Sequence, residues 1–144
     1  PMPWQHDLPH AGFTTGKPWL PVKHAQSALS VDVQEAHPDS TLNAYRKLLA
    51  WRKTYPALIN GDIAFFKCDE PVLAYRRSGE DKDLICIFNL SADPRTVKLS
   101  KVELALEPVS HNATLDGASL QLSPNGFAIL PAPVGEGRVS YKDS

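Results

Sequence analysis

The run Leu84-Ile85-Cys86-Ile87-Phe88 decides the fold class of this chain, because it is continuously apolar and turn-forming segments flank it at 78–81 and 93–94. A short apolar run between turn signals is typical of a strand that is covered on both faces. We therefore expect residues 84–88 to form the central strand of a sheet.

Strand-like segments continue on both sides of this run, and turn-rich segments such as Asp69-Glu70-Pro71 and Pro124-Asn125-Gly126 separate them. Short strands with hairpin-sized gaps and no helix between them are typical of an antiparallel β-sandwich. The predicted strands are Asp62–Lys67, Val72–Arg77, Leu84–Leu90, Arg95–Leu99, Val102–Leu106, Ala118–Leu122 and Phe127–Leu130, with a further edge strand expected around Arg138–Tyr141.

One helix is predicted ahead of the strands, from Ser40 to Tyr55. Asp39 or Ser40 is placed to cap its first amides, and Pro56 ends it because the residue before a proline avoids the helical region. Its apolar side chains span about half the circumference, which is wider than a helix on one sheet normally shows. Each large side chain contributes roughly 1.5–3 kcal/mol when buried. The face around Leu42, Leu48 and Trp51 therefore predicts a neighbour outside these 144 residues.

The first 38 residues are predicted to be a long ordered loop. Six of the chain's 13 prolines fall there, which rules out a regular helix through the whole segment (Pro1, Pro3, Pro9, Pro18, Pro21 and Pro38). The aromatic residues Trp4, Phe13 and Trp19 make the segment too apolar for typical disorder. We therefore expect it to pack against a surface that lies outside this chain.

The composition, 42% hydrophobic and 22% charged with a formal net charge of -1, is that of an ordinary globular protein. It gives no reason to expect a nucleic acid or a membrane as partner. Cys68 and Cys86 lack the spacing of a metal site and are expected to be free thiols in a reducing compartment. Together with the absence of a targeting leader, they lead us to expect a cytoplasmic protein.

Carboxylates and histidines do not form a recognisable catalytic or metal-binding pattern. His6-Asp7, the pair Asp32 and Glu35, and Asp69-Glu70 are each expected to have surface or turn roles. The five histidines form neither an i, i+4 helix pair nor an HExxH motif. We expect no metal, no cofactor and no catalytic residue in this chain.

Three blocks carry a resemblance to a known family. They are Pro1-Met2-Pro3-Trp4, the stretch 11–22 (Ala-Gly-Phe-Thr-Thr-Gly-Lys-Pro-Trp-Leu-Pro-Val) and the stretch 39–53 (Asp-Ser-Thr-Leu-Asn-Ala-Tyr-Arg-Lys-Leu-Leu-Ala-Trp-Arg-Lys). Over residues 1–61 the chain resembles the oligo-1,6-glucosidase and α-glucosidase group of glycoside hydrolase family 13, the α-amylase superfamily. Beyond residue 61 the resemblance is mainly architectural.

The resemblance implies a (β/α)8-barrel hydrolase with a retaining, two-carboxylate mechanism. Residues 1–60 would be the last loop and helix of the barrel, and residues 61–144 the C-terminal antiparallel β-sandwich domain. The catalytic carboxylates would all precede Pro1. Since barrel active sites are built from loops at the strands' C-terminal ends, one loop would line the substrate entrance (Phe13, Thr14, Thr15, Gly16 and Lys17). The implied partners are an oligosaccharide substrate and the missing barrel portion of the same protein.

Two alternatives stay open. The parent enzyme could be a relative of trehalose synthases or sucrose isomerases, because product choice depends mostly on loops absent from this chain. The chain could instead be a stand-alone carbohydrate-binding β-sandwich module that grips sugars through exposed aromatic residues. Against the second alternative, Phe65, Phe66, Tyr75 and Phe88 occur in apolar contexts that are typical of core residues. Trp4, Phe13 and Trp19 could stack on a sugar or anchor their loop.

Overall fold

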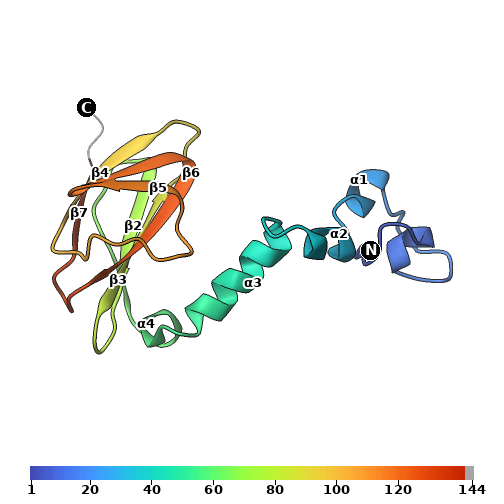
Figure 1. Ribbon diagram of the computed structural model, residues 1–144, viewed down its shortest axis with the longest axis horizontal. Helices are drawn as coiled ribbons and strands as arrows, with labels where there is room; N and C mark the ends of the chain where they lie inside the picture. Colours follow the sequence, from blue (N-terminus) through green and yellow to red (C-terminus); the bar gives the residue numbers. More distant parts are fainter. Residues whose placement is uncertain (142–144) are drawn as a thin grey trace. The chain divides into compact units, whose positions relative to one another are not determined.

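The structure, a computed structural model, describes residues 1–141. The chain folds as two compact units, Pro1–Ala50 and Trp51–Ser144. Helices and loops make up the first unit, and all the strands among residues 1–141 lie in the second unit (Figure 1). Among residues 1–141, no helix is both long and apolar enough to cross a lipid bilayer.

The first unit contains more helix than the predicted long loop. A 3₁₀ turn, η1 (Pro9–Gly12), is followed by α1 (His24–Ser27) and α2 (Val31–Ala36). Pro9 lies in the first turn of η1, where its missing amide costs nothing, and α1 and α2 lie in the proline-free stretch between residues 21 and 38. The prolines therefore limit helix length without excluding helices, and the prediction of a single helix in the chain was wrong.

The predicted long helix is α3 (Thr41–Arg52), and its first turn is capped as expected. The Ser40 hydroxyl accepts a hydrogen bond from the Asn43 amide at 3.2 Å. Tyr55 adopts the extended conformation expected before a proline, with φ -118° and ψ 102°, and Pro56 begins the short helix α4 (Pro56–Ile59). The helix itself ends three residues earlier than predicted, at Arg52. None of the residues of α3 is buried, as expected if its apolar arc lacks its partner. For Trp51 the prediction of a neighbour outside the chain was wrong, because its ring packs on the cluster of Leu84, Cys86 and Ile129.

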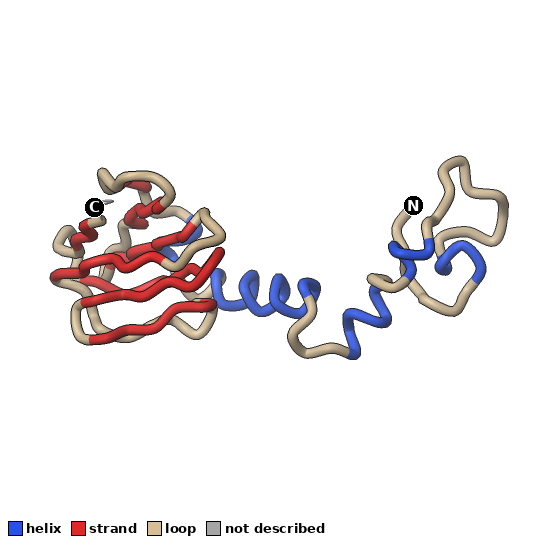
Figure 2. The backbone as a smooth tube through the Cα atoms, turned by 90° about the horizontal axis from the view of Figure 1, so that it is seen from above, coloured by secondary structure: helices blue, strands red, loops and turns tan. Residues whose placement is uncertain are grey.

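In the described part of the second unit, up to Tyr141, the strands form one seven-stranded antiparallel sheet with the order β1-β2-β3-β6-β4-β7, and β5 pairs with β6 off this path. Strands lie side by side in Figure 2, and Figure 1 shows that the sheet is curled. Their bounds are β1 (Ile63–Phe65), β2 (Val72–Arg77), β3 (Asp83–Asn89), β4 (Arg95–Ser100), β5 (His111–Asp116), β6 (Ser119–Ala132) and β7 (Arg138–Ser140). The prediction of a mainly antiparallel β fold with few helices is confirmed.

The apolar run 84–88 lies in the middle of the sheet, as predicted. Strand β3 pairs with β2 on one side and with β6 on the other. Ile85 and Ile87 belong to the larger core, which also contains Val97, Leu122 and Leu130. The alternating residues Leu84 and Cys86 belong to a second cluster with Ile129. The run is therefore apolar throughout because both of its faces are covered.

The second half of the sheet differs from the prediction in three places. The segments predicted as strands 118–122 and 127–130 are one strand, β6, which pairs with β4 through residues 119–122 and with β3 through residues 127–132. Pro124 lies between these two paired segments, so its missing amide breaks neither ladder. The expected turn at residues 124–126 is therefore a change of pairing partner within one strand.

Strand β5 was missed, and the predicted strand Val102–Leu106 does not form. The amides of Glu103 and Glu107 bond to the carbonyls of Pro131 and Ile129, at 2.8 Å each. The two bonded amides are four residues apart, but the carbonyls that accept them in β6 are only two residues apart. In a regular ladder the two spacings are equal, so residues 103–107 do not form a strand with β6. Val102 still packs on the larger core, so its apolar character reflects burial without strand pairing.

Candidate functional site

The five residues predicted at the active-site rim, Phe13 to Lys17, form one continuous turn after η1. The Gly16 amide donates a hydrogen bond of 3.1 Å to the Thr14 hydroxyl. Such a bond, to a hydroxyl two residues earlier, is a local turn motif. Thr14 is half-buried, whereas Phe13, Thr15, Gly16 and Lys17 are exposed. The turn, called the rim turn below, therefore presents a phenyl ring, a hydroxyl and an ammonium group together.

A tight backbone reversal precedes the rim turn. His10, Ala11 and Gly12 have left-handed φ angles of 54°, 51° and 69°. The buried Ala11 accepts hydrogen bonds at its carbonyl from the amides of Trp4 and Gln5, at 2.8 and 3.1 Å. At Gly12 the left-handed φ disfavours any side chain, and an added Cβ would lie 3.4 Å from Gln5 Cβ. The reversal therefore fixes where the rim turn begins.

Asp32, in the first turn of α2, binds the first loop of the chain. Its two carboxylate oxygens accept the His6 amide at 3.1 and 3.0 Å, and Oδ1 also accepts the Val33 amide at 2.8 Å. The hydroxyl of the buried Ser30 donates to the same Oδ1. The Ser30 bond first, and the His6 amide next, hold the pKa of Asp32 below its ordinary value. We call this arrangement the Asp32 clasp.

Backbone and side-chain bonds extend the clasp along the same loop. The amides of Val31 and Asp32 donate to the carbonyls of Pro3 and Trp4, at 3.1 and 3.2 Å. His6 Nδ1 lies 3.0 Å from the Ser27 carbonyl oxygen. Residues 3–6 are therefore held on one side by α2 and on the other by the Ala11 carbonyl. Both the clasp and the reversal thus brace the loop from which the rim turn follows.

Sequence reasoning gave Asp32 only a surface or turn role and did not find its partner His6. A local signal was present, because Ser30 at the helix N-cap and Asp32 in the first turn are typical of a helix start. The partner lies 26 residues away, and no local pattern predicts a contact over that separation.

The aromatic residues offered as sugar-stacking or anchoring groups, Trp4, Phe13 and Trp19, are all exposed. The ring contacts between described residues involve other side chains, so no two of these three rings touch. The structure therefore does not assemble them into one stacking platform.

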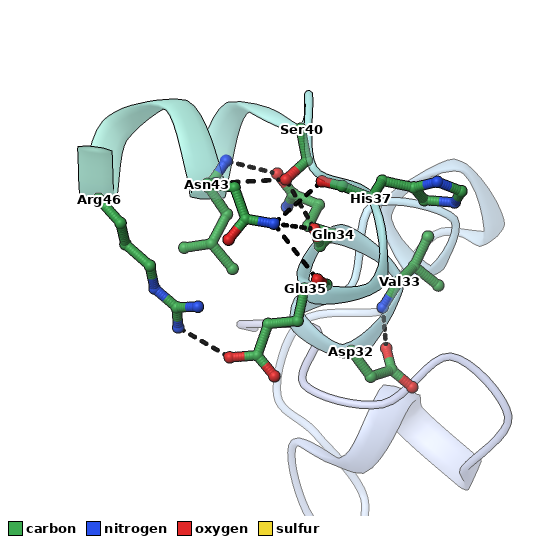
Figure 3. A network of polar contacts seen from close by, with 9 residues as sticks. Asp32, Val33, Gln34, Glu35, His37, Ser40, Asn43 and Arg46 are labelled. Atoms are coloured by element: carbon green, nitrogen blue, oxygen red, sulfur yellow. Dashed lines mark hydrogen bonds and ion pairs between the residues drawn. The ribbon is translucent and has the colours of Figure 1, made fainter. Parts of the chain in front are cut away.

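Asn43 joins the end of α2 to the start of α3 (Figure 3). Its side-chain amide donates to the carbonyls of Gln34, Glu35 and His37, at 3.0, 3.3 and 2.9 Å. These carbonyls lie at the C-terminal end of α2, where the helix supplies no partner of its own. Arg46 Nη2 also lies 2.8 Å from Glu35 Oε1 across the same joint. The Asn43 side chain, in the first turn of α3, thus holds the start of α3 against the end of α2 and fixes the conformation of the connection through Pro38 and Asp39.

Asp83 is a carboxylate of the second unit with structural partners. Asp83 is buried, accepts the amides of Gly79 and Gly135 at 3.2 and 2.8 Å, and lies 3.5 Å from Arg76 Nε. Burial of a carboxylate is tolerated only with such partners. Its hydrogen bonds are therefore used to hold two turns of the sheet.

Glu107 accepts two side-chain donors, one from the last turn of α3 and one from the segment that follows the helix. Trp51 Nε1 donates to Oε2 at 2.9 Å, and the Tyr55 hydroxyl donates to Oε1 at 2.6 Å. Burial first, and the bond to Glu107 next, raise the pKa of Tyr55 to about 12. Within residues 1–141, no group of three or more His, Cys, Asp or Glu side chains could hold a metal ion.

Comparison with known proteins identifies the relatives of this chain. The family model "Alpha amylase, catalytic domain" matches residues 1–61. A probable α-glucosidase of Rhizobium meliloti is 39% identical over 99 residues, which are 69% of this chain and 18% of the relative. The chain thus spans about a fifth of the length of this curated relative.

Two solved structures extend the likeness over nearly the whole chain. The α-glucosyl transfer enzyme XgtA is 41% identical with a TM-score of 0.84, covering 92% of this chain and 25% of the enzyme. A variant of the trehalulose synthase MutB is 29% identical with a TM-score of 0.78, also covering 92% of this chain and 25% of that protein. Both units of the chain therefore have counterparts within larger enzymes.

Proposed function

Because this chain belongs to the α-amylase family of glycoside hydrolases, we propose that it is the C-terminal part of an α-glucosidase. The parent enzyme would hydrolyse or transfer α-glucosyl units of short oligosaccharides. The observation that carries this proposal is the likeness to a glucosyl transfer enzyme over 92% of the chain, with a TM-score of 0.84. The chemistry would be retaining, with a carboxylate nucleophile and a carboxylic acid/base that both lie outside these residues.

The two parts of the chain have different proposed roles. Residues 1–60 are the last loop and helix of a (β/α)8 barrel, and residues 61–144 are a C-terminal β-sandwich domain that stabilises it. In support, residues 1–61 match the catalytic-domain model. The part of the apolar arc of α3 around Leu42 and Leu48 supports a missing barrel neighbour for the helix, because no residue of α3 is buried; Trp51 of the same arc packs on the sheet of this chain. A cytoplasmic location is part of the same proposal, supported by the free thiols of Cys68 and Cys86.

The rim turn is the proposed contribution of this chain to the substrate site. Phe13, Thr14, Thr15, Gly16 and Lys17 would line the entrance where the leaving-group sugar binds. Exposed phenyl, hydroxyl and ammonium groups can stack on a sugar ring and hydrogen-bond its hydroxyls. The Asp32 clasp and the His10–Gly12 reversal would hold this turn in place before the substrate arrives, which lowers the entropic cost of binding.

A chimera tests the proposal. In the glucosyl transfer enzyme XgtA, the quarter that aligns with this chain is replaced by this chain, and release of nitrophenol from p-nitrophenyl α-glucoside is measured. We expect an active chimera, whereas the isolated 144-residue chain should show no turnover. A folded chimera without activity, or turnover by the isolated chain, would contradict the proposal.

The same chimera tests the rim turn. Phe13→Ala and Lys17→Ala should each raise KM for a disaccharide substrate more than KM for p-nitrophenyl α-glucoside, because only the disaccharide places a second sugar at the entrance. Lys23→Ala is the matched control, since Lys23 is also exposed but lies outside the turn. If Lys17→Ala and Lys23→Ala change the disaccharide KM equally, Lys17 does not belong to the proposed site.

Isomerisation of a disaccharide is the second candidate activity of the parent enzyme. The likeness of this chain to a trehalulose synthase, with a TM-score of 0.78, supports this candidate. Sugar products of the active chimera distinguish the candidates. Free glucose indicates hydrolysis, longer oligosaccharides indicate transfer, and a rearranged disaccharide from sucrose indicates isomerisation.

A further inference from the structure

One face of the sheet, turned away from the larger core, carries mostly apolar side chains. Opposite residues of an antiparallel pair point to the same face. The register places Phe65 opposite Tyr75, Tyr75 opposite Cys86 and Cys86 opposite Ile129, so all four share this face. By the same register the face, called the aromatic face below, consists of Ile63, Phe65, Leu73, Tyr75, Arg77, Leu84, Cys86, Phe88, Phe127, Ile129 and Pro131, and Arg77 is its one charged member.

Four rings cross this face from β1 to β6. Neighbouring ring centroids are 5.8 Å apart for Phe65 and Tyr75, 5.8 Å for Tyr75 and Phe88, and 5.7 Å for Phe88 and Phe127. The last two pairs have nearly parallel planes, at 21° and 20°, as in offset stacking. Rings that stack on each other do not offer those faces to a sugar. The row is therefore better suited to packing against protein than to binding a glucan.

One end of the aromatic face is covered. Trp51, Tyr55 and Leu58 pack against the cluster of its buried members Leu84, Cys86 and Ile129. All three covering residues belong to the segment 1–61 that matches the catalytic-domain model. The hydrogen bonds from Trp51 and Tyr55 to Glu107 hold this cover in place. The established contact of the aromatic face is thus with a piece of catalytic domain.

The other end of the same face is open. Phe65 is 66% exposed, Ile63 49% and Leu73 37%, although their strand neighbours on this face are half-buried or buried. Ile63 lies opposite Arg77, whereas Phe65 lies opposite Tyr75 and Leu73 opposite Phe88. Scattered exposed apolar residues are normal, but exposed residues such as Phe65 and Leu73 that continue a packed apolar surface are typical of an interaction site. The sequence-based view that Phe65 is a core residue was therefore wrong within this chain.

We propose that the open end of the aromatic face, Ile63, Phe65 and Leu73, is a docking surface for the remainder of the catalytic domain of the same protein. The docked domain continues the contact that Trp51, Tyr55 and Leu58 begin, and it buries the Phe65 ring. This inference rests on the proposed function, because it takes the missing partner to be an α-amylase-type catalytic domain. It assigns the exposed aromatic residue Phe65 to domain assembly and not to sugar binding.

Hydroxyl-radical footprinting of the isolated chain and of the XgtA chimera tests this proposal. Phe65 should be oxidised readily in the isolated chain and several-fold more slowly in the chimera. Leu104 is an internal control, because it is 56% exposed and belongs to neither apolar cluster. Its oxidation should be equal in the two proteins.

The outcomes separate this proposal from the proposed function. Equal oxidation of Phe65 in the isolated chain and in an active chimera overturns the docking surface and leaves the proposed function standing. Protection of Phe65 in a folded but inactive chimera supports the docking surface and counts against the proposed function. Protection of Phe65 in the isolated chain by maltoheptaose overturns the docking surface in favour of a glucan site.

A second variant tests the energetic role of the surface. Phe65→Ser should leave unfolding of the isolated chain nearly unchanged, because the ring is exposed there, but it should lower the thermal stability of the chimera. Leu104→Ser should change neither. If the chimera does not fold, Phe65 is footprinted in this chain mixed with XgtA lacking the aligned quarter. Oxidation of Phe65 unaffected by that partner overturns the proposal.

Discussion

The Tyr55 hydroxyl donates a hydrogen bond of 2.6 Å to Glu107 Oε1, although 52 residues separate the two in the chain. Trp51 Nε1 occupies the other oxygen of the same carboxylate at 2.9 Å. The two rings also contact each other, with centroids 5.1 Å apart. One carboxylate from the connection between β4 and β5 therefore holds Trp51, in the last turn of α3, and Tyr55, three residues after the helix. It fixes both aromatic residues on the aromatic face.

Tyr55→Phe should destabilise the second unit by about 1 kcal/mol, because it removes one hydrogen bond to a carboxylate that keeps its second donor. Urea unfolding of the isolated chain measures the free energy of unfolding. Tyr45→Phe is the matched control, since Tyr45 is exposed on α3, and it should have no effect. Equal stability of the Tyr55→Phe variant and the native chain would mean that the bond contributes nothing.

The same tyrosine predicts a pH dependence at alkaline pH. Burial and the Glu107 bond raise its pKa from 10.0 to about 12 in the folded chain. A raised pKa in the folded state means that the stabilisation is fully present below pH 10 and is lost as the pH rises towards about 12. The stability difference between native chain and Tyr55→Phe variant should therefore shrink above pH 10. Comparing the variant with the native chain cancels the contribution of Tyr75, whose pKa is also raised to about 12.

Asp32→Asn should loosen the loop that leads to the rim turn. The neutral amide accepts hydrogen bonds more weakly than the carboxylate, so the His6 and Val33 amides should exchange hydrogen for deuterium several-fold faster. Asp7→Asn is the control, because the Asp7 side chain is 97% exposed. A His6 amide that exchanges at the native rate in the Asp32→Asn variant would show that the clasp does not hold the loop.

The Asp32 clasp also predicts a pH dependence at acid pH. Its pKa lies below the ordinary value of 3.8, so its stabilisation is present above that pH and is lost as the pH falls through the lowered value. Protection of the His6 amide from exchange should fall in this acid range. In the Asp32→Asn variant, which has no carboxylate to protonate, the same pH change should have a smaller effect on His6.

Asp83→Ala should destabilise the second unit by about 2–4 kcal/mol, because it leaves the Gly79 and Gly135 amides and Arg76 without a buried partner. Urea unfolding provides the measurement. Asp81→Ala, at an exposed position in the same hairpin, should change the stability by less than about 0.5 kcal/mol. Similar values for the two variants would contradict a structural role for Asp83.

Gly61→Ala should be among the most damaging small substitutions in the chain. An added Cβ would lie 2.0 Å from the Ser78 carbonyl oxygen and 2.4 Å from that of Ala57, both of which are backbone atoms that cannot rotate away. Overpacking of this kind costs about 3 kcal/mol. Gly16→Ala is the control, since the nearest atom to its Cβ would be Thr14 Oγ1 at 3.8 Å. Thermal unfolding of the two variants distinguishes these outcomes, and a Gly61→Ala chain as stable as Gly16→Ala would rule out the close approach.

Local patterns in the sequence predicted the elements whose cause is local. Ser40 and Pro56 were recognisable as the start of α3 and the stop before α4, because capping and the missing proline amide act within a few residues. The run 84–88 was recognisable as a central strand because both faces of the strand are covered, so none of its side chains points to solvent and none needs to be polar. The prediction of strand 102–106 was wrong because burial of Val102 and Leu106 resembles strand alternation without requiring a ladder.

Of the candidate site, the sequence predicted the rim turn as one continuous segment, and its role in substrate binding stays a prediction. Sequence reasoning could not find what braces it. The Ala11 carbonyl is a backbone group with no side-chain signature, and His6 contributes to the Asp32 clasp through its amide. Backbone groups are the same in every residue, so their partners are visible only in the folded chain.

The sequence by itself determined the order of helix and sheet, the central strand and the family resemblance of residues 1–61, since these depend on residue patterns over short distances. Only the tertiary structure decided that residues 119–132 form one strand, that Glu107 binds Trp51 and Tyr55, and that Phe65 is left exposed. The physical reason is that each of these depends on which distant segment packs alongside. Such pairings follow from the free energy of the whole fold and not from any local stretch.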